Sequence, residues 1–193
     1  RRNDHIYRHN QTAAESVLLY SRKAVHAGKV TDVQKFLKLG DSLLDRHILF
    51  DVLPDDLATT KTLANYKAVY RTNGKTPVAS DRIKITAPTT VRASLSRPAK
   101  DDALHLHFVN YNRTEPKTPR SAGGGIHDEK PIAVKGIQCS MAIPKGKKLK
   151  HIRFFTPEKN GAQELIATTK EQRVQFTVPE FLVYGVVELE FGK

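Results

Sequence analysis

The sequence predicts an α/β portion followed by an all-β portion: a partial flavodoxin-like parallel sheet, then an antiparallel β-sandwich. Strand-like and helix-like apolar patterns alternate up to about residue 72, as in a sheet built from crossover connections. From Ile83 onward the apolar residues recur with a period of two, and proline or glycine stands in most of the gaps, which is typical of short antiparallel strands. We therefore expect a tail or linker over 1–15, an α/β domain over 16–81 and a β-sandwich domain over 82–193.

The first portion contains short apolar runs separated by helix-like segments. Its predicted strands are 17–20, 48–53 and 68–70, and its predicted helices are 32–46 and 59–65. The first helix has an apolar stripe at helical spacing and a cap at Thr31 or Asp32, and the second has a cap at Thr59 or Thr60. Gly40 lies inside the first helix and predicts a close approach to a strand. Residues 21–30 read as a loop. This order of elements indicates a parallel sheet.

The second portion is organised around residues 103–111. Leu104, Leu106 and Phe108 share one parity, while His105 and His107 share the other. Because side chains alternate across a strand, this pattern predicts one face in a core and one polar outer face. The further predicted strands are 82–87, 90–96, 132–143, 150–156, 163–168, 172–178 and 182–191.

Composition narrows the function classes. The chain has 193 residues, a net charge of +12 and no apolar run long enough to cross a bilayer, so we expect no membrane partner. A positive charge of this size is typical of proteins that bind nucleic acid. However, the densest basic patch, 145–151, lies between two apolar strands, where we expect a solvated hairpin turn. The chain opens without methionine or an apolar leader, and we expect it to start partway into a longer protein.

No residue pattern predicts a catalytic, cofactor or metal site. Cys139 is the single cysteine and lies within a predicted strand without a glycine elbow, which favours a core position over a nucleophile. His105 and His107 could bind a metal with a third ligand, but we favour the polar outer face. The acidic pairs 55–56 and 101–102 read as turn formers and helix caps rather than as the two carboxylates of a glycosidase.

Two stretches resemble known proteins. Residues 48–57, Ile-Leu-Phe-Asp-Val-Leu-Pro-Asp-Asp-Leu, together with Leu63–Val69, resemble part of the glutamine-amidotransferase-like trimerisation domain appended to bacterial beta-galactosidases and related glycoside hydrolases. Residues 104–112, Leu-His-Leu-His-Phe-Val-Asn-Tyr-Asn, resemble a strand of the β-sandwich that often closes such proteins, and 184–190 resemble its last strand. The family's α/β domain has several further strands, so the sheet here is either reduced or interrupted between about 71 and 82.

The resemblance implies a non-catalytic C-terminal portion of a glycoside-hydrolase-like protein, because the family's catalytic carboxylates lie on a barrel domain outside this sequence. Its implied roles are domain packing, oligomerisation or carbohydrate contact. The implied partners are a preceding catalytic domain, a homo-oligomer or a polysaccharide, and the implied location is periplasmic or secreted. Exposed aromatics suit sugar contact, and the candidates are Tyr111, Phe181 and Tyr184. A nucleic-acid-associated protein and a free-standing hydrolase remain the alternatives.

Overall fold

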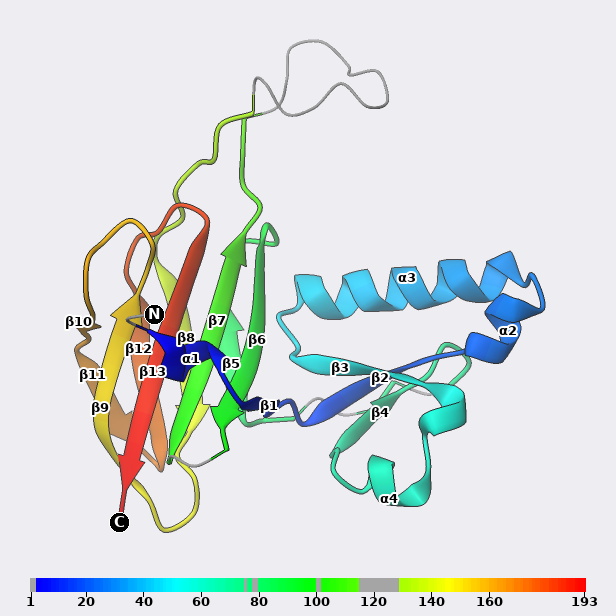
Figure 1. Ribbon diagram of the computed structural model, residues 1–193, viewed down its shortest axis with the longest axis horizontal. Helices are drawn as coiled ribbons and strands as arrows, with labels where there is room; N and C mark the ends of the chain where they lie inside the picture. Colours follow the sequence, from blue (N-terminus) through cyan, green and yellow to red (C-terminus); the bar gives the residue numbers. More distant parts are fainter. Residues whose placement is uncertain (1–2, 75, 78–79, 100–101, 115–128) are drawn as a thin grey trace.

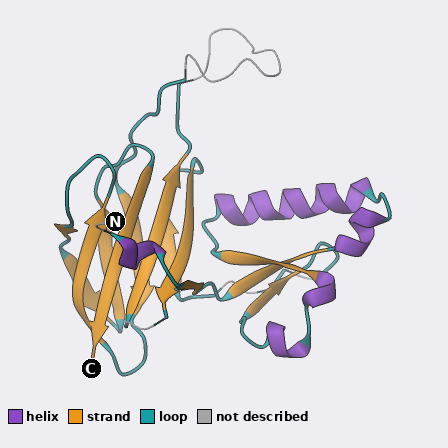
Figure 2. Cartoon of the chain, in the orientation of Figure 1, coloured by secondary structure: helices purple, strands orange, loops and turns teal. Residues whose placement is uncertain are grey.

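The structure, a computed structural model, describes residues 3–74, 76–77, 80–99, 102–114 and 129–193. These residues form a small parallel sheet with helices beside it and two antiparallel sheets stacked as a sandwich (Figures 1 and 2). The predicted fold class, α/β followed by a β-sandwich, is confirmed. The domain boundaries at 15 and 81 stay predictions.

The parallel sheet has the strand order β3-β2-β4, and both neighbours of β2 run parallel to it. Its elements in chain order are β2 (Ser16–Tyr20), α2 (Arg22–His26), α3 (Val30–Asp45), β3 (Phe50–Pro54), the 3-10 helix η1 (Asp55–Leu57), α4 (Thr60–Leu63) and β4 (Ala68–Tyr70). A first strand in the centre with the next two on either side is the start of a flavodoxin-like order.

Helix α3 packs on this sheet through its apolar stripe. Leu43 is 1% exposed and clusters with Leu18 of β2 and Tyr70 of β4. Gly40 faces the same way: a Cβ added there would lie 3.6 Å from Leu18 Cδ2. The predicted close contact between helix and strand is therefore confirmed, and the distance leaves room for one methyl group.

The helix starts differ in part from the expectation. Residues 21–30 were expected to be a loop but include the short helix α2, and α3 begins at Val30 without a side-chain cap. The predicted cap at Thr31 or Asp32 is therefore wrong, because the chain turns at Gly28, where φ is +70°, and the helix begins directly afterwards. The cap of α4 is confirmed: Thr59 and Thr62 form a reciprocal capping box.

The sandwich consists of a six-stranded and a four-stranded antiparallel sheet. The six-stranded sheet contains β1 (Asn10–Thr12), β6 (Val91–Pro98), β7 (Ala103–Asn110), β13 (Tyr184–Gly192), β9 (Lys148–Phe155) and β10 (Gln163–Glu164), in that order. The four-stranded sheet contains β11 (Ala167–Lys170), β12 (Arg173–Val178), β8 (Ile137–Ala142) and β5 (Ile83–Thr86). Figure 1 shows the four-stranded sheet behind the six-stranded one.

The sandwich core lies between these sheets. Leu106 and Phe108 of β7 are fully buried and cluster with Met141 of β8, Val174 of β12 and Val187 of β13. The predicted inward parity of β7 is confirmed. The basic segment 145–151 begins in a turn, as expected, but the turn joins β8 of one sheet to β9 of the other and is not a hairpin.

The expectation of a tail over residues 1–15 is wrong for residues 4–12. Helix α1 (Asp4–Tyr7) lies across the outer face of the six-stranded sheet, and β1 extends that sheet by pairing with β6 (Figure 1). Ile6 is fully buried against Phe155 and Val186, two apolar residues on the outer face of the sheet. Burying these three side chains together removes apolar surface from water, which holds α1 in place.

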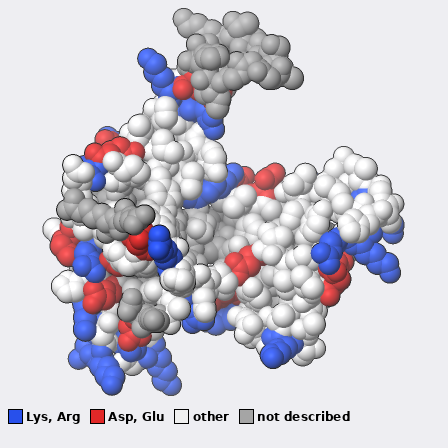
Figure 3. Space-filling view, viewed as in Figure 1, with Lys and Arg blue, Asp and Glu red and all other residues white. Residues whose placement is uncertain are grey.

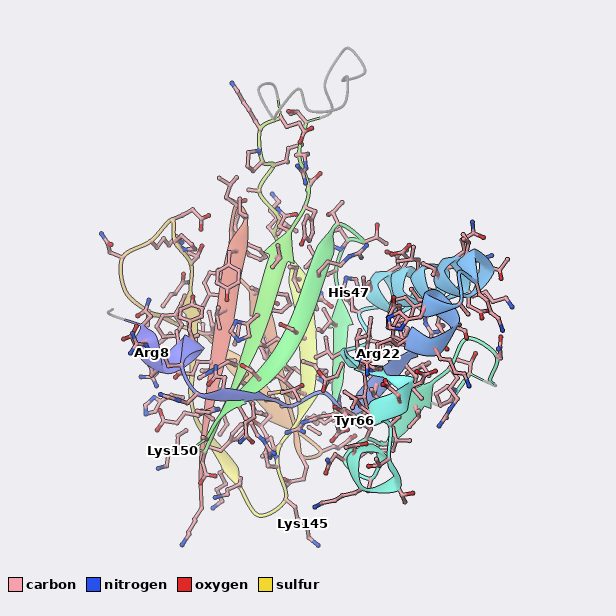
Figure 4. The ribbon with its side chains drawn as sticks, turned by 45° about the vertical axis from the view of Figure 1, so that its right-hand side comes forward. Arg8, Arg22, His47, Tyr66, Lys145 and Lys150 are labelled. Atoms are coloured by element: carbon pink, nitrogen blue, oxygen red, sulfur yellow. The ribbon has the colours of Figure 1, made fainter. Side chains whose placement is uncertain are left out.

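The two portions contact each other through several side chains. Leu49, just before β3, belongs to the sandwich core cluster. Arg92 Nη1 of β6 lies 3.0 Å from Asp45 Oδ1 at the end of α3, and His47 Nε2 lies 3.2 Å from the Pro88 carbonyl oxygen. Figure 4 shows His47 between α3 and the strands of the sandwich. In the described part of the chain, no helix has the length and apolarity to cross a membrane.

Candidate functional site

The three predicted aromatic contact residues lie in different environments. Tyr111 follows β7 and is 54% exposed, so its ring is open to solvent. Phe181 is 2% exposed and lies in the core, with its ring centroid 6.3 Å from Phe108 and 6.2 Å from Phe154. The Phe181 ring therefore has no open face for a sugar. Tyr184 is half-buried, with its hydroxyl 2.7 Å from Nδ1 of His107. The structure does not gather these residues into one surface.

Tyr184 contacts, through His107, a polar cluster on the outer face of the six-stranded sheet. We call His105, His107, Arg153 and Glu188 the outer-face cluster. Glu188 is 4% exposed; its Oε2 lies 2.9 Å from Arg153 Nε and its Oε1 lies 3.5 Å from His105 Nε2. Helix α1, which covers this face, adds one contact to the cluster: His5 Nε2 lies 3.3 Å from Glu188 Oε1.

The electrostatics of this cluster favour a structural role. Burial opposes the charge of Glu188, but the close contact with His105 and the charges of Arg153 and His5 outweigh it, so the pKa of Glu188 is lowered. Burial, assisted by His105, lowers the pKa of His107 to about 4. The expectation of a solvated polar face is therefore wrong at His105, which is 1% exposed, because α1 and β1 cover it. Among the described residues, no group of three His, Cys, Asp or Glu side chains is placed to hold a metal ion.

The other residues considered for chemistry have structural positions. Cys139 is buried in β8, and burial raises the pKa of its thiol to about 12, so the predicted core position is confirmed. Asp55 accepts a hydrogen bond from the Ser21 hydroxyl at 2.8 Å and one from the backbone N–H of Arg22, the first residue of α2. Asp56 forms an ion pair with the Arg22 side chain where the chain leaves β2 and β3. Figure 4 labels Arg22 in the α/β portion. The predicted role of the pair 55–56 in turns and caps is confirmed.

The outer face of the four-stranded sheet holds an open groove of about 780 Å³. Outward residues of its strands line up across the sheet in two rows. The first row consists of Thr168, Gln175, Ser140 and Lys84, which are successive partners in the register from β11 to β5. The second row consists of Thr177, Gln138 and Thr86. Neighbouring strands are about 4.8 Å apart, so the first row spans about 14 Å.

The groove is lined by amide and hydroxyl groups that are free to bind. Gln138, Gln175, Thr168 and Thr177 are exposed, and none of their side chains makes a hydrogen bond within the described residues. Ser140 Oγ accepts a hydrogen bond from Arg173 Nε at 2.9 Å, which leaves its own proton to donate. The groove can therefore both donate and accept hydrogen bonds along its length.

One wall of the groove is the segment that passes from β10 to β11. This segment contributes Gln163, Glu164, Leu165 and Ile166 to the lining. Ile166 is 94% exposed and is the most exposed of the large hydrophobic residues described. Lys84 and Glu164 are the charged residues of the lining, and their charges are opposite. The groove thus offers hydrogen-bonding groups and an aliphatic edge without an excess of either charge.

This groove was not among the sites predicted from the sequence. The signal was present in the alternation of β8 and β12, where the neighbouring outward positions 138, 140, 175 and 177 carry amide or hydroxyl side chains. The position of the wall depends on how the chain crosses between the sheets, which periodicity does not show.

Basic residues do not gather into one binding surface on the face that Figure 3 shows. Lys and Arg are spread over both portions of this face, with Asp and Glu between them. Several are paired: Lys147 Nζ lies 2.6 Å from Asp102 Oδ2, and Arg113 Nη1 lies 2.7 Å from Glu129 Oε2. In Figure 4, Lys145 and Lys150 extend away from one end of the sandwich.

Comparison with known proteins adds little to these observations. No family model matches the sequence, and no curated protein is significantly similar to it. Similar solved structures include an alpha-L-fucosidase from Paenibacillus thiaminolyticus, with 18% identity and a TM-score of 0.42, covering 58% of this chain and 16% of that one. Another is a cycloisomaltooligosaccharide glucanotransferase from a Paenibacillus species, with 14% identity and a TM-score of 0.41, covering 77% of this chain and 27% of that one. The chain spans a small part of either protein, and scores this low carry no argument about its function.

Proposed function

We propose that this chain is a non-catalytic accessory part of a glycoside-hydrolase-like protein and that its β-sandwich contacts carbohydrate through the groove on the four-stranded sheet. The observation that carries the proposal is the double row of polar side chains in that groove, in which Gln138, Gln175, Thr168 and Thr177 make no hydrogen bond among the described residues. The resemblance of residues 48–57 and 104–112 to domains of such hydrolases supports it from the sequence side.

The chemistry of the groove suits a neutral sugar chain. A pyranose presents hydroxyl groups, which both donate and accept, around a ring with apolar C–H faces. Gln138 and Gln175 offer both kinds of hydrogen-bonding atom, while the exposed Ile166 offers an apolar edge. Because the lining holds one cation and one anion, it does not favour a polyanion such as nucleic acid, whose binding depends on neutralising phosphates.

The α/β portion would serve as a packing module in this proposal. It contacts the sandwich through Leu49 and the Asp45–Arg92 ion pair. The carboxyl ends of β2 and β3 are tied together by Ser21, Arg22 and the acidic pair 55–56. In an open parallel sheet, ligands commonly bind at that edge, so these contacts favour a packing role over a small-molecule site.

Affinity electrophoresis through gels that contain soluble neutral polysaccharides tests the proposal. We expect at least one polysaccharide to retard the 193-residue chain and the Gln138→Ala/Gln175→Ala double variant to lose that retardation. Gln34→Ala is the matched control, because Gln34 is an exposed glutamine on α3. Absence of retardation by every polysaccharide, or equal retardation of all variants, would contradict the proposal.

A further inference from the structure

A second cavity, of about 300 Å³, lies where the parallel sheet meets the sandwich. We call it the junction cavity. Its lining includes Ser16 at the start of β2, Arg46 and His47 after α3, and Arg82 and Lys84 at β5. Figure 4 shows His47 at this junction. The junction cavity shares Lys84 of β5 with the groove, but Ser16, Arg46 and Arg82 do not line the groove, and the inference drawn from them does not depend on the carbohydrate proposal.

The hydroxyl of Ser16 lines this cavity without a partner. Ser16 is 1% exposed, and its Oγ makes no hydrogen bond within the described part of the chain. Buried polar groups are nearly always hydrogen-bonded, because leaving one unpaired is costly. The Ser16 hydroxyl is therefore available to a hydrogen-bonding group that enters the cavity.

Cationic groups dominate the surroundings of the cavity. Arg46 makes no salt bridge among the described residues, and Arg82 Nη1 lies 3.4 Å from Glu15 Oε1, which Lys67 also contacts at 3.0 Å. Two cations therefore share one carboxylate, and Arg46 remains unmatched. Asp81 also lines the cavity, but it does not supply a negative charge to balance Arg46.

Asp81 is already satisfied by other cations. Lys84 Nζ lies 2.9 Å from its Oδ1, and Arg173 Nη1 lies 3.4 Å from its Oδ2. These two cations lower the pKa of Asp81, chiefly through the hydrogen bond from Lys84. The cavity thus keeps an excess of positive charge.

We propose that the junction cavity binds a small oxyanion, with the Ser16 hydroxyl donating a hydrogen bond to it and the Arg46 and Arg82 guanidinium groups balancing its charge. Hydroxyl and guanidinium groups are the donors that carboxylate and phosphate oxygens accept from most readily. The shared chemistry is that of an oxyanion, which either a phosphate or the carboxylate of an acidic sugar supplies.

Thermal unfolding and calorimetric titration with inorganic phosphate and with glucuronate, each against chloride at equal ionic strength, test this proposal. A ligand that binds only the folded state raises the unfolding temperature in a saturable manner. We expect this for at least one of the two anions, and the one that binds identifies the source. Ser16→Ala and Arg46→Gln should each weaken binding about tenfold, as expected for a lost hydrogen bond to a charged group.

The control is Lys159→Gln, which removes an exposed cation from the loop between β9 and β10 and should leave binding unchanged. In chloride alone, Ser16→Ala should unfold at the same or a higher temperature, because it removes an unpaired buried hydroxyl. The proposal is overturned if neither anion differs from chloride, if Lys159→Gln weakens binding as much as Arg46→Gln, or if Ser16→Ala is destabilised in chloride.

Discussion

Replacing Glu188 with glutamine tests the electrostatics of the outer-face cluster. The substitution keeps the size of the side chain and removes its charge, so Arg153 loses a carboxylate 2.9 Å from its Nε. Breaking a buried ion pair by neutralising one partner costs about 3–5 kcal/mol. Arg153 is 33% exposed and keeps Glu190 Oε2 at 2.9 Å from its Nη2. We therefore expect a lower cost, about 2–3 kcal/mol of unfolding free energy at pH 7.

The same variant should change the pH dependence of stability. Because the pKa of folded Glu188 is lowered below 4.5, its contribution is fully present above about pH 5 and is lost as pH falls through the depressed value. The pKa of folded His107 is lowered from 6.5 to about 4, so the fold also loses stability as pH falls from about 6.5 to about 4. The Glu188→Gln variant should keep the loss of stability that comes from His107 and lack the further loss that comes from protonation of Glu188.

Urea denaturation at intervals from pH 7 to pH 4 measures both effects. The wild-type free energy should fall more steeply than that of Glu188→Gln below about pH 5. Glu190→Gln is the matched control, because it contacts the same arginine from a more exposed position, and we expect it to cost less than about 1 kcal/mol. Equal stability of wild type and Glu188→Gln at pH 7, or parallel pH profiles, would refute this account of the cluster.

Three glycine substitutions test the packing. Gly185→Ala should destabilise by about 1–3 kcal/mol in urea denaturation, because the added Cβ would lie 2.7 Å from Phe154 Cε2 in the core; no loss of stability would contradict that packing. Gly192→Ala should cost less in the same assay, since its Cβ meets only a flexible lysine side chain, and a cost equal to that of Gly185→Ala would contradict this. Gly40→Ala should raise the unfolding free energy by up to about 1 kcal/mol, because alanine favours the helix and the Cβ would lie 3.6 Å from Leu18 Cδ2; a decrease would show that α3 lies closer to β2.

The sequence was sufficient for most of the elements because periodicity determines them. The outward and inward parity of 103–111 predicted the core face of β7, and the alternation of strand and helix patterns predicted the parallel sheet. The helix α1 was missed because four residues with one apolar anchor, Ile6, form no repeating pattern. The signal lay in its partners: Phe155 and Val186 are apolar at outward positions, which implies that something covers them.

The candidate site was less predictable for a physical reason. A groove depends on which strands lie side by side, and β8 pairs with β12 and β5, neither of which is next to it in the sequence. Phe181 was a candidate for sugar contact because it is aromatic. The structure buries it in the sandwich core, where it is 2% exposed. Residue type alone therefore does not separate an exposed aromatic from a buried one near the end of a strand.

The most direct test of carbohydrate contact is an NMR titration of the labelled chain with the polysaccharide fragment that retards it most in gels. We predict that the side-chain amide signals of Gln138 and Gln175 shift together and saturate, while that of Gln34 stays fixed. Shifts confined to residues outside the groove, or no saturable shift of either glutamine, would contradict the account.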